Sequence, residues 1–119
     1  MINVNYQIWF KVCKPIKHRY GLSTNCLMVL NGVYVYSKYK NNSFTRRCIT
    51  DFVSYYDNKR ITKYIQILLD HKYIIEAGIK NKRFQLYSLS PPGLQVIKEL
   101  NKSYEEEIYK FCSLYNISL

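Results

Sequence analysis

Residues 57–90 carry the sequence pattern that decides the fold, and they read DNKRITKYIQILLDHKYIIEAGIKNKRFQLYSLS. Ile61, Ile65 and Leu68 are spaced by four and three residues, which predicts a helix with one apolar face. An Asp-Asn pair stands directly before this face, and either side chain can cap the start of the helix. The first half of the stretch therefore predicts a capped amphipathic helix.

The second half of the stretch predicts a β-hairpin. Residues 73–77 are rich in Ile and Tyr, and residues 84–89 alternate well enough to form a second strand. The polar and basic residues 80–83 form the turn between them. Ser90 can then cap a last helix that begins at Pro91, because proline suits the first helical position. The hairpin therefore has a basic tip and leads directly into a final helix.

A further short helix is expected before this stretch. Thr45 can cap it, and Phe52 and Val53 lie three and four positions after Ile49. Residues 55–58 then form a turn. The order helix, turn, helix, basic hairpin and closing helix is that of a winged helix-turn-helix, a mainly α fold with a small β-hairpin. In that arrangement the second helix enters the major groove of DNA, where each base pair presents its own pattern of donors and acceptors.

The N-terminal segment predicts another helix. Ile8, Val12 and Ile16 are four residues apart and form an apolar stripe within residues 3–18. Pro15 lies inside the stripe and is expected to kink or end the helix, because proline cannot donate the backbone hydrogen bond.

The segment between this helix and the short one is less decisive. Residues 20–24 contain a glycine followed by Ser and Thr, which suits a connector that caps the next helix. Apolar residues between 26 and 33 fit that helix, although the run 33–36 also fits a strand. With 119 residues the chain has the length of one domain, in which residues 44–90 form the helix-turn-helix and wing.

The last helix, expected over residues 91–116, carries a regular apolar seam. Its members are three or four positions apart, as in a coiled coil, and they are Ile97, Leu100, Tyr104, Ile108, Phe111 and Tyr115. We expect the first five to form a dimer interface together with the N-terminal helix. The seam could instead fold back onto its own domain, and Ser103 followed by Glu106 could start a separate helix.

Charge is distributed unevenly along the chain. Its 18 Lys and Arg residues exceed its 8 Asp and Glu residues, which gives a net charge of +10. Residues 1–83 hold 15 of the basic and 4 of the acidic residues, whereas residues 84–119 are nearly balanced. An AT-rich gene can enrich Lys, Asn, Ile and Tyr, but base composition does not separate charge in this way. The first two thirds of the chain are therefore expected to meet a polyanion.

Several motifs resemble those of MarR-type transcription regulators. Residues 61–68 and 73–76 are similar to the family's recognition helix and following strand, and Leu-Ser-Pro-Pro-Gly at 89–93 is similar to its LTxxG signature after the wing. The Tyr-Gly-Leu-Ser connector at 20–23 is similar to the GLT before the family's second helix. The clear resemblance covers residues 44–100 and implies a winged helix that binds DNA as a dimer.

The resemblance also implies which residues meet DNA. Base-reading positions fall on Asn58, Lys59, Arg60, Thr62 and Lys63. Arg and Lys can donate to guanine, Asn can pair with adenine, and the Thr methyl can meet thymine. Arg83 corresponds to the family's minor-groove arginine, and Asn81 stands where an Asp usually holds it. Contacts that position the protein are expected from Arg46, Arg47, Lys80 and Lys82. Without the hairpin behind it, the basic cluster on the helix would be interpreted as a solvated face.

Most other polar and aromatic residues are expected to be structural. The cysteines, at positions 13, 26, 48 and 112, show no zinc-ligand spacing and are interpreted as small core residues, with a redox-sensing thiol as the alternative. His18 and His71 are isolated. The tyrosines at 55, 56, 64 and 73 are expected to pack, although they could stack on single-stranded bases.

The sequence thus predicts a cytoplasmic regulator that reads a pseudo-palindromic duplex site as a homodimer. One alternative is an accessory DNA-binding protein of replication or of a mobile element. Another is a winged helix that binds protein, which would not need basic residues on both helix and wing. No export signal, membrane span, catalytic motif, metal site or cofactor motif is expected, and a small-molecule effector is possible only by the resemblance.

Overall fold

The computed structural model describes residues 4–53, 57–80 and 82–115, without the side chains of residues 4–6 and 80. In chain order the elements are α1 (Val4–Tyr20), α2 (Thr24–Tyr39), α3 (Arg46–Phe52), α4 (Asn58–Asp70), β1 (Ile74–Lys80), β2 (Phe84–Leu89) and α5 (Pro91–Leu114). The two strands pair antiparallel. The predicted fold class, mainly α with a small β-hairpin, is confirmed.

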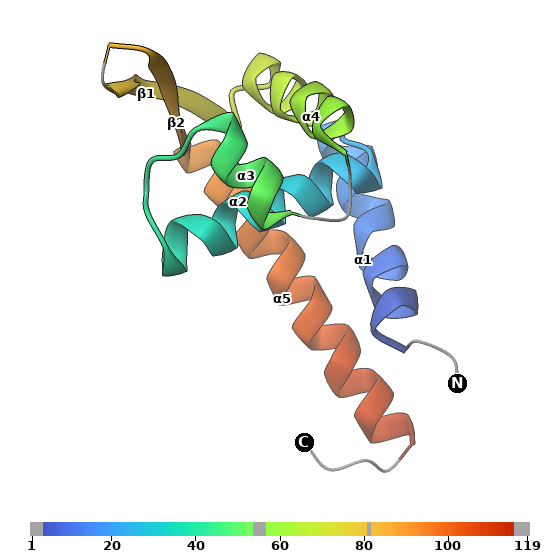
Figure 1. Ribbon diagram of the computed structural model, residues 1–119. Helices are drawn as coiled ribbons and strands as arrows, with labels where there is room; N and C mark the ends of the chain where they lie inside the picture. The colour runs from blue at the N-terminus through green and yellow to red at the C-terminus, as the bar shows by residue number, and fades with distance from the viewer. Residues whose placement is uncertain (1–3, 54–56, 81, 116–119) are drawn as a thin grey trace.

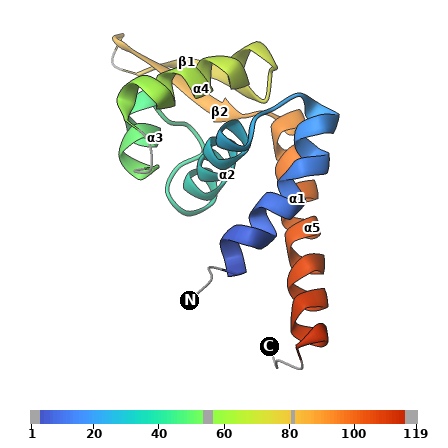
Figure 2. The same cartoon turned by 90° about the vertical axis from the view of Figure 1, so that its right-hand side faces the viewer.

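The elements are arranged as a head and a stem. The head consists of α2, α3, α4 and the β1–β2 hairpin, which we call the wing, and the wing projects from it (Figure 1). The stem consists of α5 with the antiparallel α1 beside it, so that α1 begins and α5 ends at the far end from the head (Figure 2). The resulting shape is elongated, with extents of 56 × 27 × 23 Å.

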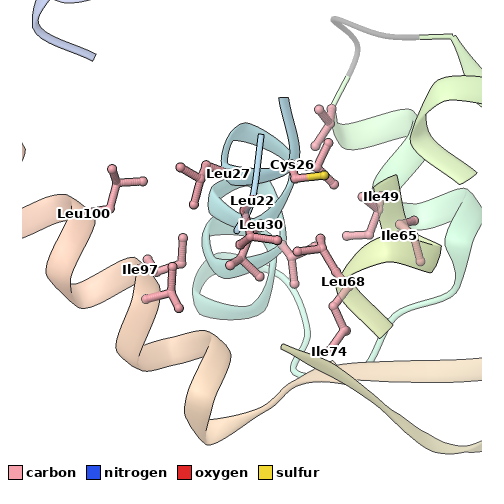
Figure 3. Close-up of a cluster of buried hydrophobic side chains, with 14 of the residues drawn as sticks. Leu22, Cys26, Leu27, Leu30, Ile49, Ile65, Leu68, Ile74, Ile97 and Leu100 are labelled. Carbon is pink, nitrogen blue, oxygen red and sulfur yellow. The ribbon is translucent and has the colours of Figure 1, made fainter. Parts of the chain in front are cut away.

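Helix α2 lies at the centre of the hydrophobic core. Leu27 and Leu30 of α2 have Ile97 and Leu100 of α5 on one side, and the buried side chains of α3 and α4 on the other (Figure 3). The latter are Ile49, Ile65 and Leu68. Because one helix is packed from both sides, the head and the upper stem share a single core.

Four helices begin at a capping side chain. Ser23, Thr45, Asp57 and Ser90 accept hydrogen bonds from the backbone N–H groups of Cys26, Cys48, Arg60 and Gly93, at 3.2, 3.2, 2.9 and 3.1 Å. Each bond satisfies a donor that the first turn of a helix leaves unpaired. The capping predictions for these four helices are confirmed.

Pro15 does not end α1, because the helix continues to Tyr20. Ile8 and Val12 before the proline, and Ile16 after it, are all buried. Their packing offsets the backbone hydrogen bond that proline cannot donate.

The segment after the connector is helical throughout, which rules out the strand considered for residues 33–36. Gly32 lies inside α2 at a close approach to Val53, where an added Cβ would lie 2.4 Å from the Val53 Cγ2 atom. The glycine therefore allows the end of α3 to contact α2 directly.

Helix α5 is continuous from Pro91 to Leu114, so no separate helix starts at Ser103. Ile97 and Leu100 are buried in the core of their own chain. Tyr104 stacks on Trp9 of α1, with ring centroids 4.8 Å apart. The assignment of Ile97 and Leu100 to a dimer interface was therefore wrong, because the chain's own helices already cover them.

The first strand of the wing is longer than the sequence predicted. β1 extends to Lys80 rather than to residue 77, with a bulge between Glu76 and Gly78 that accommodates one extra residue. At its base, Phe44 forms an isolated bridge with Tyr87, through backbone hydrogen bonds of 2.9 and 2.8 Å. The wing is therefore joined to the segment before α3.

The first turn of α5 contacts the turn that follows α4. The Ser90 hydroxyl donates to the Lys72 carbonyl oxygen at 2.6 Å, and the Ser90 N–H donates to that of Tyr73 at 3.1 Å. A Cβ on Gly93 would lie 2.1 Å from the Tyr73 carbonyl oxygen. The Leu-Ser-Pro-Pro-Gly motif thus forms the joint between head and stem.

We predict that Gly93→Ala destabilises the protein by about 2 kcal/mol, because the new methyl group must displace the backbone at Tyr73. Urea unfolding followed by circular dichroism measures the loss. The control is Gln95→Ala, an exposed change on the same turn, which should shift stability by less than about 0.5 kcal/mol. Equal stability of the two variants would contradict the close approach.

Candidate nucleic-acid interface

Helix α4 presents an exposed polar and basic face. Ile61, Ile65 and Leu68 are buried in the core. The predicted base-reading residues Asn58, Lys59, Arg60, Thr62 and Lys63 are all exposed. The apolar periodicity of α4 therefore places the cationic residues of its first two turns on the outer surface of the head.

Both ends of α4 are tightly held. At its start, Asp57 accepts the backbone N–H of Arg60. At its end, Lys72 has a positive φ of 62° and its N–H donates to the Leu69 carbonyl oxygen, while the Tyr73 N–H donates to that of Leu68. These two bonds form a Schellman motif, which normally uses glycine at the position of Lys72. The helix therefore has defined limits on the surface.

A side-chain contact also ties α4 to α2. The Asn25 amide at the start of α2 donates to the Tyr64 hydroxyl at 2.9 Å. Sequence reasoning missed this pair, because the two residues are 39 positions apart. The bond links α4 to the start of α2, in addition to the buried contacts of Ile61, Ile65 and Leu68.

The wing tip carries exposed basic residues. Lys82 and Arg83 are exposed, and Lys82 has a positive φ of 57°, which turns the chain between the strands. The side chain of Lys80 and the whole of Asn81 lie outside the described residues, so their predicted roles stay predictions. The described basic tip extends away from the core on the hairpin (Figure 1).

The two arginines at the start of α3 differ in their surroundings. Arg47 is exposed and forms a salt bridge of 3.7 Å with Asp51 one turn later. Arg46 is partly buried, with its guanidinium 5.9 Å from the centre of the Tyr87 ring and its Nη2 atom 3.4 Å from Oε1 of Gln66. Its Nε is buried and has no hydrogen-bond partner among the described residues. Arg46 therefore packs between α3, α4 and the wing, whereas Arg47 faces solvent.

A groove of about 540 Å³ lies between α3 and the wing. It is lined by Thr45, Arg46, Arg47, Cys48, Arg83, Phe84, Gln85 and Tyr87. Three arginines from two separate elements thus border the same groove, although the sequence places Arg83 far from the other two. The site residues on α3 and on the wing are brought together here.

The acidic residues near α4 set the limit of the basic surface. Asp70 ends the helix and accepts a hydrogen bond of 3.0 Å from the Gln66 amide, and Glu76 is exposed on β1. Asp57 at the start of α4 is also exposed, so the described cationic side chains of this surface are those of the first half of α4, the wing tip, Arg47, and Lys72 in the turn after α4.

The tyrosines in the described residues pack against neighbouring side chains. Tyr64 and Tyr73 are partly buried against the core. The ring of Tyr73 stacks on His71, with centroids 5.8 Å apart, and meets Tyr20 edge to face at 6.2 Å. Tyr55 and Tyr56 lie outside the described residues. The packing of Tyr64 and Tyr73 is as the sequence predicted.

Two cysteines are core residues. Cys13 and Cys26 are buried, and burial raises the pKa of the Cys13 thiol. Cys48 is partly buried and accepts a hydrogen bond of 3.2 Å from the Thr45 hydroxyl. The burial of Cys13 and Cys26 agrees with their interpretation as small apolar side chains.

Among the described residues, no group of three or more His, Cys, Asp or Glu side chains is placed to hold a metal ion. No helix in that part of the chain is both long and apolar enough to cross a membrane.

The head, with α3 and α4 joined by a turn and followed by a hairpin, defines a winged helix-turn-helix. No protein-family model and no curated protein sequence matches the chain. Solved structures do match it, and the three described below are 11–12% identical to the chain, which shows likeness of fold alone.

One matching structure is MepR, a transcription regulator of the Staphylococcus aureus multidrug efflux pump MepA. It is 11% identical, with a TM-score of 0.75, over 93% of this chain and 78% of MepR. The S. aureus MepR–DNA complex is also 11% identical, over 87% of this chain and 75% of MepR, with a TM-score of 0.73.

Another is the apo form of MarR from E. coli, 12% identical over 99% of this chain and 87% of MarR, with a TM-score of 0.71. The chain thus has the fold of the MarR-type regulators, and the resemblance seen in the sequence motifs is confirmed at the level of the fold.

We predict that Arg46→Ala lowers the stability of the head by about 1 kcal/mol, because it removes the packing on Tyr87 and the contact with Gln66. Thermal unfolding measures the effect. Arg47→Ala, the matched control one residue later, removes only an exposed ion pair and should leave stability within about 0.5 kcal/mol. The opposite ranking would show that Arg46 is not a packing residue.

Proposed function

We propose that this protein is a transcription regulator that binds duplex DNA as a homodimer and reads a pseudo-palindromic site. The observation that carries the proposal is the surface of α4: its apolar residues are buried, and its first two turns expose three cationic side chains. Solved structures with the same fold support it, since they include the transcription regulator MepR and its complex with DNA.

In the proposed complex α4 enters the major groove. Lys63 and Arg60 donate to the acceptor atoms of guanine, Asn58 forms paired hydrogen bonds with adenine, and the methyl group of Thr62 meets that of thymine. A helix held at both ends suits this task, because base discrimination requires donors in fixed positions.

The wing and α3 contact the DNA backbone in this proposal. Arg47 and Lys82 neutralise phosphates, and these contacts set the register without reading sequence. Arg83 enters the adjacent minor groove, whose negative potential attracts arginine where the groove is narrow. Arg46 acts indirectly, by holding α3, α4 and the wing together.

A homodimer is proposed at the far end of the stem. Tyr109, Leu114 and Tyr115 are large apolar or aromatic residues that are exposed there. A groove of about 240 Å³ lies between α1 and α5 and is lined by Gln7, Ile8, Lys11, Glu107, Lys110, Phe111 and Leu114. Exposed apolar surface of this kind typically marks an interface. Pairing two stems there would present two α4 helices to one DNA duplex.

We predict that the protein binds duplex DNA with an affinity that falls steeply with salt. A plot of the logarithm of the binding constant against the logarithm of the salt concentration should steepen by about 0.9 for each phosphate contacted. Lys63→Ala should reduce preference for a site selected from random DNA by about 1–3 kcal/mol relative to scrambled DNA. Lys82→Ala should weaken binding to both DNAs equally and lower the slope by about one. Fluorescence anisotropy titrations at several salt concentrations measure all three quantities.

The two variants control each other, because each removes one exposed lysine of the same surface. Absence of duplex binding by the unmodified protein at low salt would exclude the proposal and leave a protein-binding winged helix. An equal loss on both DNAs for Lys63→Ala would show that α4 does not read sequence, and an architectural accessory role would replace regulation.

We also predict that Leu114→Asp produces monomers, because a charge at the far end of the stem would have to be buried in the dimer. Analytical ultracentrifugation at about tens of micromolar measures the oligomeric state. Tyr39→Asp is the control, since Tyr39 is equally prominent on the surface but lies at the end of α2. An unmodified protein that is already monomeric would refute the stem interface.

A further inference from the structure

The wing carries large apolar side chains that its own core does not require. Ile79 and Phe84 flank the tip and are 65% and 54% exposed. The core of the head ends further down the hairpin, at the buried Tyr87. Because they are mostly exposed, Ile79 and Phe84 contribute little to the apolar core, and their side chains are free to contact a ligand.

Strand register places the two side chains on opposite faces of the hairpin. Lys80 pairs with Phe84, and Ile79 pairs with Gln85. Paired residues share a face and successive residues alternate, so Ile79 lies on one face and Phe84 on the other. Lys82 and Arg83 stand at the apex between them. The tip is therefore a narrow ridge with a cationic apex and an apolar residue on each side.

Charge complementarity indicates which ligand this ridge would bind. The cationic apex favours a polyanion, and the apolar flanks favour surfaces such as deoxyribose rings and base faces, which the DNA minor groove provides. That groove is about 6 Å wide in B-form DNA, whereas a hairpin with side chains on both faces is about 10 Å thick. The ridge can enter only if the groove opens.

We propose that the wing tip is a wedge that opens the minor groove and unstacks a base step, with Phe84 as the inserting side chain and Ile79 against the opposite wall. This inference rests on the proposed binding of duplex DNA and adds how the flanks of the site are recognised. Apolar wedges of this type kink DNA toward the major groove.

The wedge and Arg83 have different preferences among A·T sequences. Arginine alone favours stiff A-tracts, because their minor groove is narrow. A wedge favours TA steps, because pyrimidine–purine steps are easily kinked and unstacked. The two flanks have the same base composition, so their comparison isolates deformability.

The test uses the site selected from random DNA. Hydroxyl-radical footprinting first locates the base step beneath the wing. The flanking sequence around that step is then replaced by either an alternating TA sequence or an A-tract. The unmodified protein should bind the site with the TA flank about tenfold more tightly than the site with the A-tract, and it should raise the fluorescence of 2-aminopurine placed at that step. Phe84→Ser should abolish both effects and still bind, and Ile79→Ser should reduce both.

Ile75→Ser is the matched control, because Ile75 pairs with Ser88, shares the face of Phe84 and lies at the base of the wing. It should retain the flank preference and the fluorescence change. Thermal unfolding verifies that each variant is folded, and Ile79→Ser provides a second variant if Phe84→Ser is not.

The outcomes separate this inference from the function on which it rests. If the unmodified protein binds no duplex, the proposed function fails and the wedge fails with it. If it binds duplex DNA but prefers the A-tract and does not raise the fluorescence of 2-aminopurine, the proposed function stands and the wedge is wrong. The wedge is also wrong if Phe84→Ser retains the unmodified protein's flank preference.

Discussion

The architecture depends on the contact between the first turn of α5 and the turn that ends α4. Ser90 binds the carbonyl oxygens of Lys72 and Tyr73, and Gly93 allows the helix backbone to approach Tyr73 without a side chain between them. The wing begins and ends at this point, since β1 starts at Ile74 and β2 ends at Leu89. One small group of hydrogen bonds therefore sets the directions of α4, the wing and the stem together.

Other local contacts hold the candidate interface in place. Helix α4 is capped at its start, closed by a Schellman motif at its end, and linked to α2 through Asn25 and Tyr64. Its exposed cations consequently have a defined direction relative to the wing. By contrast, Arg46 is used to connect the parts of this surface, so not every cation near the interface is available to a ligand.

Much of the fold could be predicted from the sequence, because its elements are marked by local signals. Caps, apolar spacing and the Leu-Ser-Pro-Pro-Gly motif all act within a few residues. The seam of α5 shows the limit of such signals. The regular spacing of its apolar residues indicates that another helix packs against it. Spacing alone cannot show whether that helix belongs to another chain or is α1 of the same chain. In the structure, Leu100 is covered by its own chain.

In the candidate site, too, some features follow from local sequence and others depend on contacts between distant residues. Exposure of Lys63 followed from the periodicity of α4, whereas the burial of Arg46 depends on Tyr87, which is 41 positions away. Pro15 and the pairing of Asn25 with Tyr64 likewise depend on packing between distant segments. Long-range contacts of this kind are absent from any single window of sequence.

The 24 residues of α5 give the stem the properties of a lever arm. A helix of that number of residues is about 36 Å long, close to the roughly 34 Å of one turn of DNA. In the proposed homodimer, a few degrees of bending in α5 beyond Leu100, where the helix leaves the shared core, would shift the two reading heads relative to each other by a few ångströms. The curvature of this part of α5 would therefore tune the separation of half-sites that the protein accepts, independently of how each head recognises its own bases.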